Sequence, residues 1–239
     1  MPETVLVVGS TGNIGLAAVK AALDTGRNVL AVVRTQASAD KLFKFIGSDK
    51  GITTVEADVL SDTAIKGVVD QVRAGKLPAF QHVWSSVGGE YVADPIQGIT
   101  TERLRKNLNS MFEANFFAYR DTIGYLLEQN NPASTWTICT GAQGDMALYV
   151  LPAMTQGALF PFCKAAAREN ENTNVRFNEV YLAFRVEVDA DAVEHGVTKS
   201  SEFAKVYEML LAAPEVRGSR VLLMNPDEDL RKLNHHKKN

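Results

Sequence analysis

The sequence predicts one α/β domain, a Rossmann-type doubly wound parallel sheet of about seven strands with helices on both faces. Short apolar runs alternate with amphipathic segments over nearly all of the 239 residues, a pattern typical of parallel βαβ units. Right-handed crossovers between such strands place helices on both faces of the sheet. The first apolar run also enters a glycine-rich turn that opens a helix, as in dinucleotide-binding folds. In these sheets ligands bind at the carboxyl ends of the strands, so those loops are searched for a site.

The expected strands are short and rich in β-branched residues, and they cover residues 4–9, 28–34, 52–59, 80–88, 134–141, 175–184 and 219–224. Helical spacing of apolar residues predicts helices over residues 13–26, 39–47, 62–75, 101–129, 152–169 and 201–213. Within the helix at 152–169, Pro161 removes a backbone donor and predicts a kink or an irregular turn.

The composition argues against several classes of partner. The net charge is −3, which does not favour a nucleic-acid or membrane-surface binder. There is no signal-peptide pattern and no apolar run of membrane-spanning length, so we expect a cytoplasmic protein. Residues 1–230 are expected to form the domain, and the basic tail at residues 231–239 is expected to be a solvated terminus. No metal-ligand set is apparent.

The segment GSTGNIG between the first strand and the first helix predicts a pyrophosphate site. Its glycines allow a tight turn and a close approach of the backbone, and the helix N-terminus offers free N–H groups. The alternative is a tight turn without a ligand. The predicted cofactor contacts here are Gly9, Ser10, Thr11, Gly12, Asn13, Ile14 and Gly15.

The end of the second strand favours NADP(H) over NAD(H). NAD-preferring proteins usually place an acid there for the ribose 2′-hydroxyl, whereas this chain has Arg34, with Thr35 and Ser38 close behind. A guanidinium can pair with a 2′-phosphate. The alternative for Arg34 is a solvated surface arginine.

Two further strand ends are expected to line the cofactor. Asp58 and Val59 end the third strand, where they can face the adenine, although Asp58 can instead cap the next helix. Ser86, Val87 and Gly88 follow the fourth strand and are small enough to let the chain pass close to a ribose.

Together these motifs resemble the short-chain dehydrogenase/reductase family over nearly the whole chain. The resemblance implies that Asn115 and Thr140 take the places of the family's asparagine and serine. The family's Tyr-x-x-x-Lys pair is missing, because no tyrosine of this sequence is followed by a lysine four residues later. Met154 and Ala158 are expected to stand where the pair would be, on an apolar wall.

Without that pair, reduction of a ketone lacks its usual proton donor, whereas a cationic imine needs only a nearby anion. Asp145, in the loop after the fifth strand, is the leading candidate for that anion, and Glu90 is the second. Arg185, past the sixth strand, can orient a carboxylate or stack on the cofactor. The alternatives are a turn cap for Asp145, a solvated acid for Glu90 and an ordinary salt bridge for Arg185.

A narrower resemblance is to fungal indole-alkaloid enzymes of this family that lack the pair, the malbrancheamide and paraherquamide Diels–Alderases and the citrinadin Pictet–Spenglerase. It implies an NADPH-dependent enzyme that couples a cyclisation to hydride reduction of an iminium, on a tryptophan-derived amine, imine or diketopiperazine-like substrate. The alternatives are a non-catalytic NADP(H) sensor and a reductase with a relocated donor such as Tyr149. Aromatic residues on the helices at 101–129 and 152–169 predict a homodimer or homotetramer.

Overall fold

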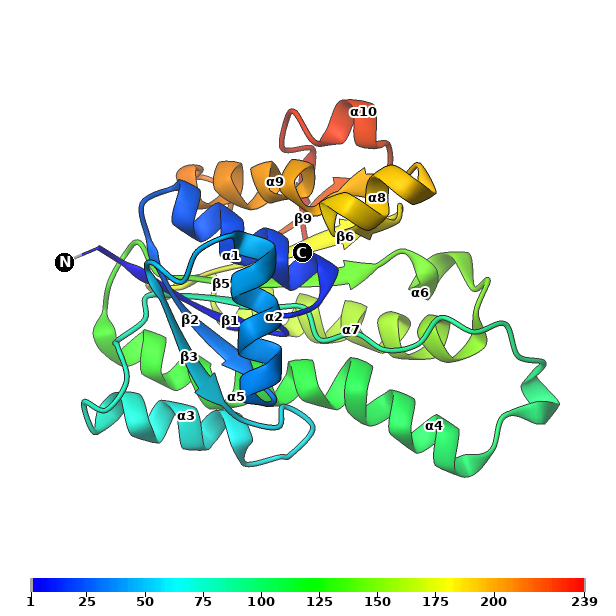
Figure 1. Ribbon diagram of the computed structural model, residues 1–239, viewed down its shortest axis with the longest axis horizontal. Coiled ribbons are helices and arrows are strands. Elements are labelled where there is room, and N and C mark those ends of the chain that lie inside the picture. The colour runs from blue at the N-terminus through cyan, green and yellow to red at the C-terminus, as the bar shows by residue number, and fades with distance from the viewer. Residues whose placement is uncertain (1, 239) are drawn as a thin grey trace.

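The computed structural model describes residues 2–238, in which one sheet is covered by helices on both faces (Figure 1). The sheet has eight strands in the order β10-β9-β6-β5-β4-β1-β2-β3. The predicted doubly wound architecture is confirmed, with eight strands instead of about seven. The strands are β1 (Thr4–Val8), β2 (Asn28–Val33), β3 (Ile52–Glu56), β4 (His82–Ser85), β5 (Thr135–Gly141), β6 (Arg176–Leu182), β9 (Ser219–Leu223) and β10 (His235–Lys237).

The additional strand comes from the basic tail. Residues His235–Lys237 pair antiparallel with β9, whereas the other strands pair in parallel. These three residues of the tail are therefore part of the sheet, and their side chains are exposed, as expected of a solvated terminus.

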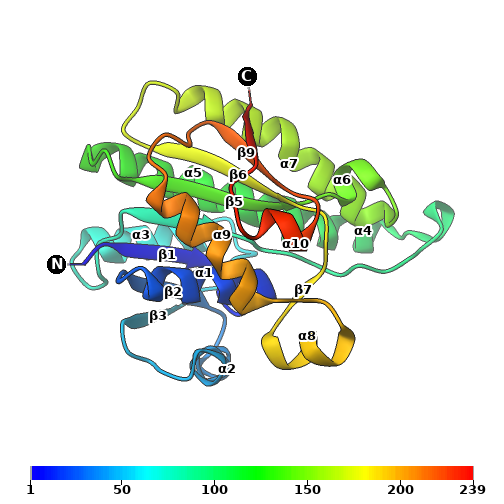
Figure 2. The same cartoon turned by 90° about the horizontal axis from the view of Figure 1, so that it is seen from above.

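Two apolar cores lie on the two faces of the sheet. One face is covered by α1 (Asn13–Asp24), α2 (Gln36–Ile46) and α9 (Ser200–Ala212), and the other by α3 (Ala64–Arg73), α5 (Ala114–Gln129) and α7 (Val150–Glu169). Figure 2, turned by 90°, shows these layers on either side of the strands. The shorter elements are η1 (Ile96–Gly98), α4 (Thr101–Asn107), α6 (Gln143–Met146), β7 (Val186–Glu187), α8 (Asp189–His195), β8 (Thr198–Lys199) and α10 (Pro226–Asp229). No helix among residues 2–238 is long and apolar enough to cross a membrane.

Two helices differ from the sequence prediction. The single helix expected at 101–129 is divided into α4, a π-helical segment η2 (Leu108–Glu113) and α5, and π turns often occur beside functional residues. Helix α7 begins at Val150, and Pro161 lies inside it without ending it.

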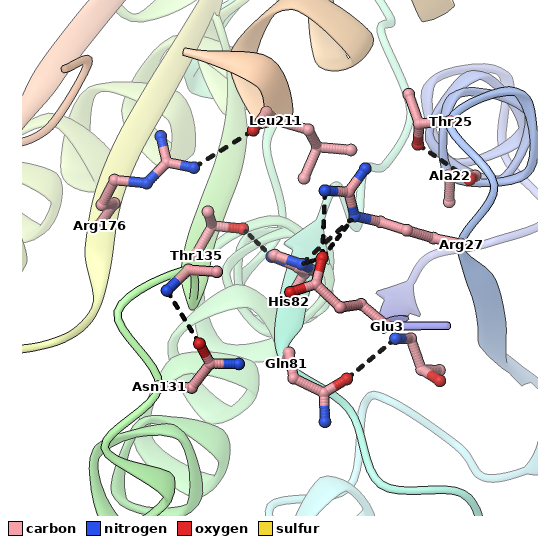
Figure 3. Close-up of polar contacts among 12 residues, drawn as sticks. Glu3, Ala22, Thr25, Arg27, Gln81, His82, Asn131, Thr135, Arg176 and Leu211 are labelled. Carbon is pink, nitrogen blue, oxygen red and sulfur yellow. Dashed lines mark hydrogen bonds and ion pairs between the residues drawn. The ribbon is translucent and has the colours of Figure 1, made fainter. Parts of the chain in front are cut away.

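The strand order reverses between β1 and β4, which places the switch point of the sheet there. The opposite, amino-terminal edge of the strands carries a buried polar cluster (Figure 3). There His82, 1% exposed, contacts Glu3 Oε2 through Nε2 at 3.0 Å and Thr135 Oγ1 through Nδ1 at 3.0 Å. Burial lowers the pKa of His82 to about 4, so the imidazole is neutral near pH 7. This cluster joins the starts of β1, β4 and β5 and lies away from the ligand-binding edge.

Candidate functional site

The glycine-rich loop lies at the switch point, against the end of β4. Gly9 has φ +87°, and a Cβ there would lie 3.0 Å from the Ser86 carbonyl oxygen. A Cβ on Gly15 would lie 2.0 Å from the Gly9 carbonyl oxygen. Gly12, the N-cap of α1, provides no side-chain cap, so the first N–H groups of the helix are open to an anion. The loop that the sequence predicts as a pyrophosphate site thus has a suitable backbone shape.

Within this loop, Ser10 has a structural role. Its hydroxyl is fully buried and donates to the Val32 carbonyl oxygen at 2.6 Å, which ties the loop to β2. Because this hydroxyl is already occupied, Ser10 can make the predicted cofactor contact only through its backbone. The Ile14 side chain packs against the core, whereas Gly12 and Asn13 are exposed and Thr11 is half-buried.

The end of β2 leaves Arg34 open to a ligand. Arg34 is exposed and makes no ion pair within residues 2–238. Thr35 is the N-cap of α2, and its Oγ1 accepts from the Ser38 N–H and lies 3.2 Å from Ser38 Oγ. The two hydroxyls therefore stabilise the helix start beside the guanidinium.

At the end of β3, Asp58 caps a turn and not the next helix. Its Oδ1 accepts from the Leu60 N–H at 3.2 Å, while the N-cap of α3 is Thr63. Asp58 itself is exposed, and Val59 beside it is partly buried against the core.

Asn115 is fully occupied inside the protein. Its Nδ2 donates to the carbonyl oxygens of Val87 and Met111, and its Oδ1 accepts from Ser85 Oγ and the Val87 N–H. With 1% exposure it cannot contact a substrate, so its assignment as a catalytic residue is corrected to a positioning one. It clamps the loop that carries Ser86, Val87 and Gly88.

Ser86 provides a test of whether this loop fits a cofactor. Its Oγ is buried and has no hydrogen-bond partner among the described residues, and buried polar groups are normally paired. A Cβ on Gly88 would meet nothing within 4 Å. An orphaned hydroxyl beside open space fits a bound ribose.

Thr140 does not face a substrate. Its hydroxyl donates to Glu179 Oε1 at 2.7 Å, and both side chains are buried. Glu179 also pairs with Arg220, whose Nε lies 2.9 Å from Oε2, and with Lys238 from the C-terminal tail. Thr140 is thus part of a buried ion-pair cluster, and its predicted place as the family's serine is wrong. Successive strand residues face opposite sides of a sheet, so the neighbouring Cys139 side chain lies on the other face.

The wall that α7 presents to β5 also differs from the sequence prediction. Met154 is 49% exposed, whereas Pro152 and Gln156, four residues apart, are buried. Gln156 Oε1 accepts from the Gly141 N–H at 2.6 Å. Gln156 of α7 thus contacts the end of β5, whereas the Met154 side chain is exposed.

Asp145 lies in the short helix α6 after β5 and is held by one tyrosine. Tyr181 donates its hydroxyl to Asp145 Oδ2 at 2.8 Å, while Oδ1 has no hydrogen bond among residues 2–238. Burial, followed by the hydrogen bond to Asp145, raises the pKa of Tyr181 to about 12. The Arg220 guanidinium lies 4.7 Å from the centre of the Tyr181 ring. Asp145 is exposed, so its free oxygen can meet a ligand.

The other two charged candidates are paired elsewhere. Glu90 is exposed and lies 3.5 Å from Lys106 Nζ, an ion pair on the surface of α4. Arg185 pairs with Glu187, which His195 also contacts at 2.6 Å. Glu90 is thus a solvated acid and Arg185 a member of an ordinary salt bridge, the alternatives stated for them. The structure does not bring either residue together with Asp145.

Tyr91 at the end of β5 was missed by sequence reasoning, whereas its neighbour Tyr149 was named there as a possible relocated donor. The Tyr91 hydroxyl oxygen lies 3.3 Å from where a Cβ on Gly141 would be, at the carboxyl end of β5. The Tyr91 ring packs edge-on against Tyr149 at 6.0 Å between centroids. Tyr91 is not followed by a lysine four residues later, so the Tyr-x-x-x-Lys pattern could not reveal it.

The segment after β4 and the segment from α6 into α7 both carry exposed apolar side chains, and the contact between Tyr91 and Tyr149 joins the two segments. This apolar rim, as we call it, consists of Tyr91, Val92, Ile96, Met146, Leu148 and Met154. In Figure 1 the β4–α4 segment passes beside α6 and the start of α7. A separate cavity of about 800 Å³ lies among α8, α9 and α10 and includes Arg185, but neither Asp145 nor the glycine-rich loop lines it. The cavity begins at the residues that follow β6 and β9, whereas the rim lies on the segments that follow β4 and β5.

Comparisons with known proteins agree with this fold. The family model described as short chain dehydrogenase matches residues 3–195. The short-chain dehydrogenase/reductase iacG of Pestalotiopsis fici is 53% identical over 233 residues, which are 95% of this chain and 94% of that protein.

Solved structures share the fold at lower identity. A short-chain dehydrogenase/reductase (glucose/ribitol dehydrogenase) from Brucella melitensis superimposes with a TM-score of 0.77 at 20% identity, covering 92% of this chain and 94% of that one. The ligand-free aldohexose dehydrogenase of Thermoplasma acidophilum gives 0.76 at 16%, covering 93% and 92%. ElxO with NADP bound gives 0.76 at 15%, covering 88% and 92%.

Proposed function

The chain belongs to the short-chain dehydrogenase family, and from that premise we propose that it is an NADP(H)-dependent oxidoreductase that reduces a cationic imine in a bulky, apolar substrate. The observation that carries the proposal is the carboxylate of Asp145. One of its oxygens is fixed by Tyr181 and the other is open, in an exposed turn beside Met146 and Leu148 of the apolar rim. A fixed anion next to apolar surface suits an organic cation.

Binding of NADP(H) is supported by the residues at the switch point. The open N-terminus of α1 would take the pyrophosphate, the unpaired Ser86 hydroxyl a ribose, and the free Arg34 guanidinium the 2′-phosphate. Bound there, the cofactor supplies the hydride. The structural neighbour ElxO contains NADP, which is consistent with this choice.

The arrangement of α7 favours a cation over a ketone at Asp145. The α7 side chain that contacts the end of β5 is Gln156, and its amide does not supply a proton as a tyrosine does. An iminium carbon needs no proton to accept hydride. The negative charge of Asp145 would stabilise the iminium cation before hydride transfer. The apolar rim would hold the hydrocarbon part of the substrate and exclude water.

We further propose that the substrate is a tryptophan-derived amine, imine or diketopiperazine-like compound of indole alkaloid assembly, and that reduction is coupled to a cyclisation of Pictet–Spengler or Diels–Alder type. The support is the resemblance to the fungal reductase/cyclases together with the open carboxylate and the aromatic and apolar rim. Holding a flexible precursor in one shape lowers the entropic cost of ring closure.

The test is incubation with NADPH and imines formed from tryptophan-derived amines and aldehydes, followed by cofactor oxidation and mass spectrometry of products. We expect oxidation that depends on the imine, and a loss of at least about tenfold (~1.4 kcal/mol) in Asp145→Asn. The matched control is Asp70→Asn, since Asp70 pairs only with Lys66 on the exposed face of α3. No oxidation and no cyclised product across the panel would remove the proposal.

The cofactor choice has its own test. In Arg34→Ala the affinity for NADPH should fall by about tenfold or more while that for NADH stays unchanged, because only NADPH has the 2′-phosphate. Lys44→Ala, at the far end of α2, is the control. Equal losses for both cofactors would contradict the assignment of Arg34.

A further inference from the structure

We propose that Tyr91 is a proton donor of this site: its phenol, delivered from the loop after β4 to the carboxyl end of β5, protonates a neutral carbonyl oxygen or imine nitrogen as hydride adds to the adjoining carbon. The inference rests on the proposed reductase function and adds neutral C=O and C=N groups to its substrates. A phenol on the loop after β4 would thus donate the proton that no side chain of α7 at the end of β5 can donate.

The position of the hydroxyl supports this role. The Tyr91 oxygen and the Cγ and Cδ atoms of Gln156 lie 3.3, 3.5 and 3.6 Å from the point where a Cβ on Gly141 would be. The phenol, the strand end and Gln156 therefore converge on one spot. Because residue 141 is glycine, no side chain separates the hydroxyl from that end of the strand.

The loop that carries Tyr91 is fixed at its base. Asn115 binds Ser85 and Val87, and a Cβ on Gly89 would lie 2.8 Å from Met111 Cγ. The loop is thus pressed against η2 two residues before Tyr91. The ring contact with Tyr149 supports the phenol from its other side. These contacts position the hydroxyl before a substrate arrives.

Four of the other five tyrosines are less suited to the role. Tyr181 donates to Asp145, Tyr119 is bound by Asn170, and Tyr207 is 1% exposed inside the α9 core. Tyr125 packs on Phe80 on the far half of α5. The Tyr91 hydroxyl has no hydrogen-bond partner among residues 2–238, so its proton is free to be donated.

The chemistry balances without another reagent besides NADPH, the source of the hydride. The electron pair of the C=O or C=N bond moves to the heteroatom, the O–H bond of Tyr91 breaks, and the new O–H or N–H bond forms. Burial raises the pKa of Tyr91, so the phenol is protonated at neutral pH, and an alkoxide is a still stronger base. The phenolate recovers its proton from water, since Tyr91 is 50% exposed. A permanently cationic N-alkyl iminium needs no such proton.

The decisive experiment compares two substrates in the full-length protein with NADPH: a neutral ketone and a ring-matched N-methyl iminium. In Tyr91→Phe, which keeps the ring, the ratio of ketone to iminium turnover should fall by about 100-fold or more, the usual contribution of a general acid. Asp145→Asn should change the ratio in the opposite direction. Tyr125→Phe is the control, and an equal ratio in Tyr91→Phe and wild type, or a fall in Tyr149→Phe instead, would overturn the role of Tyr91.

A second readout needs no turnover. With carbon-13 at the tyrosine Cζ, the resonance absent from Tyr91→Phe reports the titration of this phenol by NMR. Added NADP⁺ should lower the pKa of Tyr91 by about one unit or more, because the nicotinamide is then cationic. An unchanged pKa in the presence of bound NADP⁺ would overturn the placement. Failure of wild type to reduce any substrate would count against the proposed function, whereas this titration judges Tyr91 alone.

Discussion

Glu179 is a buried carboxylate that binds the Thr140 hydroxyl and pairs with Arg220 and Lys238. Thr140 was placed correctly at the carboxyl end of β5, but its hydroxyl donates to Glu179 on the neighbouring strand. A sequence gives the position of a residue along a strand, whereas its partner depends on the register between strands, here Thr140 opposite Tyr181. Glu179 lies within the largely apolar strand RFNEVYL, and a charged residue in such a strand indicates a buried ion pair. The glycine-rich loop, by contrast, was predictable because its conformation is local.

The glycine-rich loop yields a prediction for single residues. Gly15→Ala should lower the free energy of unfolding by about 1–3 kcal/mol, the usual cost of overpacking, because the new Cβ would meet the Gly9 carbonyl oxygen. Gly67→Ala, in α3 with nothing within 4 Å, should instead raise it by about 0.5–1 kcal/mol. Urea unfolding of the two variants measures both effects. Destabilisation of the same size in both would contradict the close packing at Gly15.

His82 yields a prediction for pH dependence. The native pKa of about 4 lies below the ordinary value of 6.5, so between these two pH values the unfolded state binds a proton that the native state does not. Above about pH 6.5 the titration of His82 therefore does not lower the free energy of unfolding. As the pH falls from 6.5 toward 4, the free energy of unfolding decreases by at most roughly 1.4 kcal/mol per pH unit.

Unfolding of His82→Gln and wild type, compared from pH 7 to about pH 4, checks this claim. The variant should show the shallower decline because it lacks the titrating imidazole. His236→Gln, on exposed β10, is the control. Parallel curves for His82→Gln and wild type would show that the buried imidazole is not the group that titrates.

Among whole elements, the C-terminal strand departs most from the sequence prediction. The composition of residues 231–239 is basic and polar, which is typical of a solvated tail. In the structure this charge is paired, because Lys238, which follows β10, donates to Glu179 and to the Phe160 carbonyl oxygen. The sequence of the tail alone does not indicate that it contacts the buried carboxylate of Glu179. The π-helical segment η2 is a similar case, because its hydrogen bonds depend on packing around Met111 and Asn115.

Removal of the Lys238 charge should therefore destabilise the protein. Lys238→Met leaves the buried Glu179 with Arg220 as its one charged partner among residues 2–238, and breaking a buried pair costs up to about 3–5 kcal/mol. We expect a loss of about 2 kcal/mol or more by thermal or urea unfolding. Lys232→Met, on the exposed part of the tail, should change little. Equal stability of the two variants would mean that β10 does not depend on the ion pair.

At the scale of the whole molecule, the layer architecture was the most predictable feature. The alternation of strands and helices determines which faces are apolar, and right-handed crossovers then leave few possible topologies. The same rule places the candidate site at the carboxyl ends of β1, β4 and β5. What could not be predicted is which side chains meet there, such as Tyr91 and Gln156 around Gly141.

We propose that the protein is a homodimer or homotetramer joined through α5 and α7. Phe116 is 38% exposed and packs against Phe112 and Phe162 on the outer face of these helices. Phe116→Glu should therefore reduce the mass measured by light scattering to that of a single chain. Phe45→Glu, an exposed phenylalanine on α2, should not. A wild-type protein of single-chain mass would contradict the proposal.

The central claim, hydride reduction of a cation held at Asp145, is tested most directly by a single turnover with NADPH deuterated at the transferred position of the nicotinamide. An N-methyl iminium substrate is mixed with the protein, and the product is analysed by mass spectrometry. We expect one deuterium at the former iminium carbon, in one stereochemical configuration, and a rate at least about tenfold lower in Asp145→Asn. A product without deuterium, or an unchanged rate in Asp145→Asn, would contradict it.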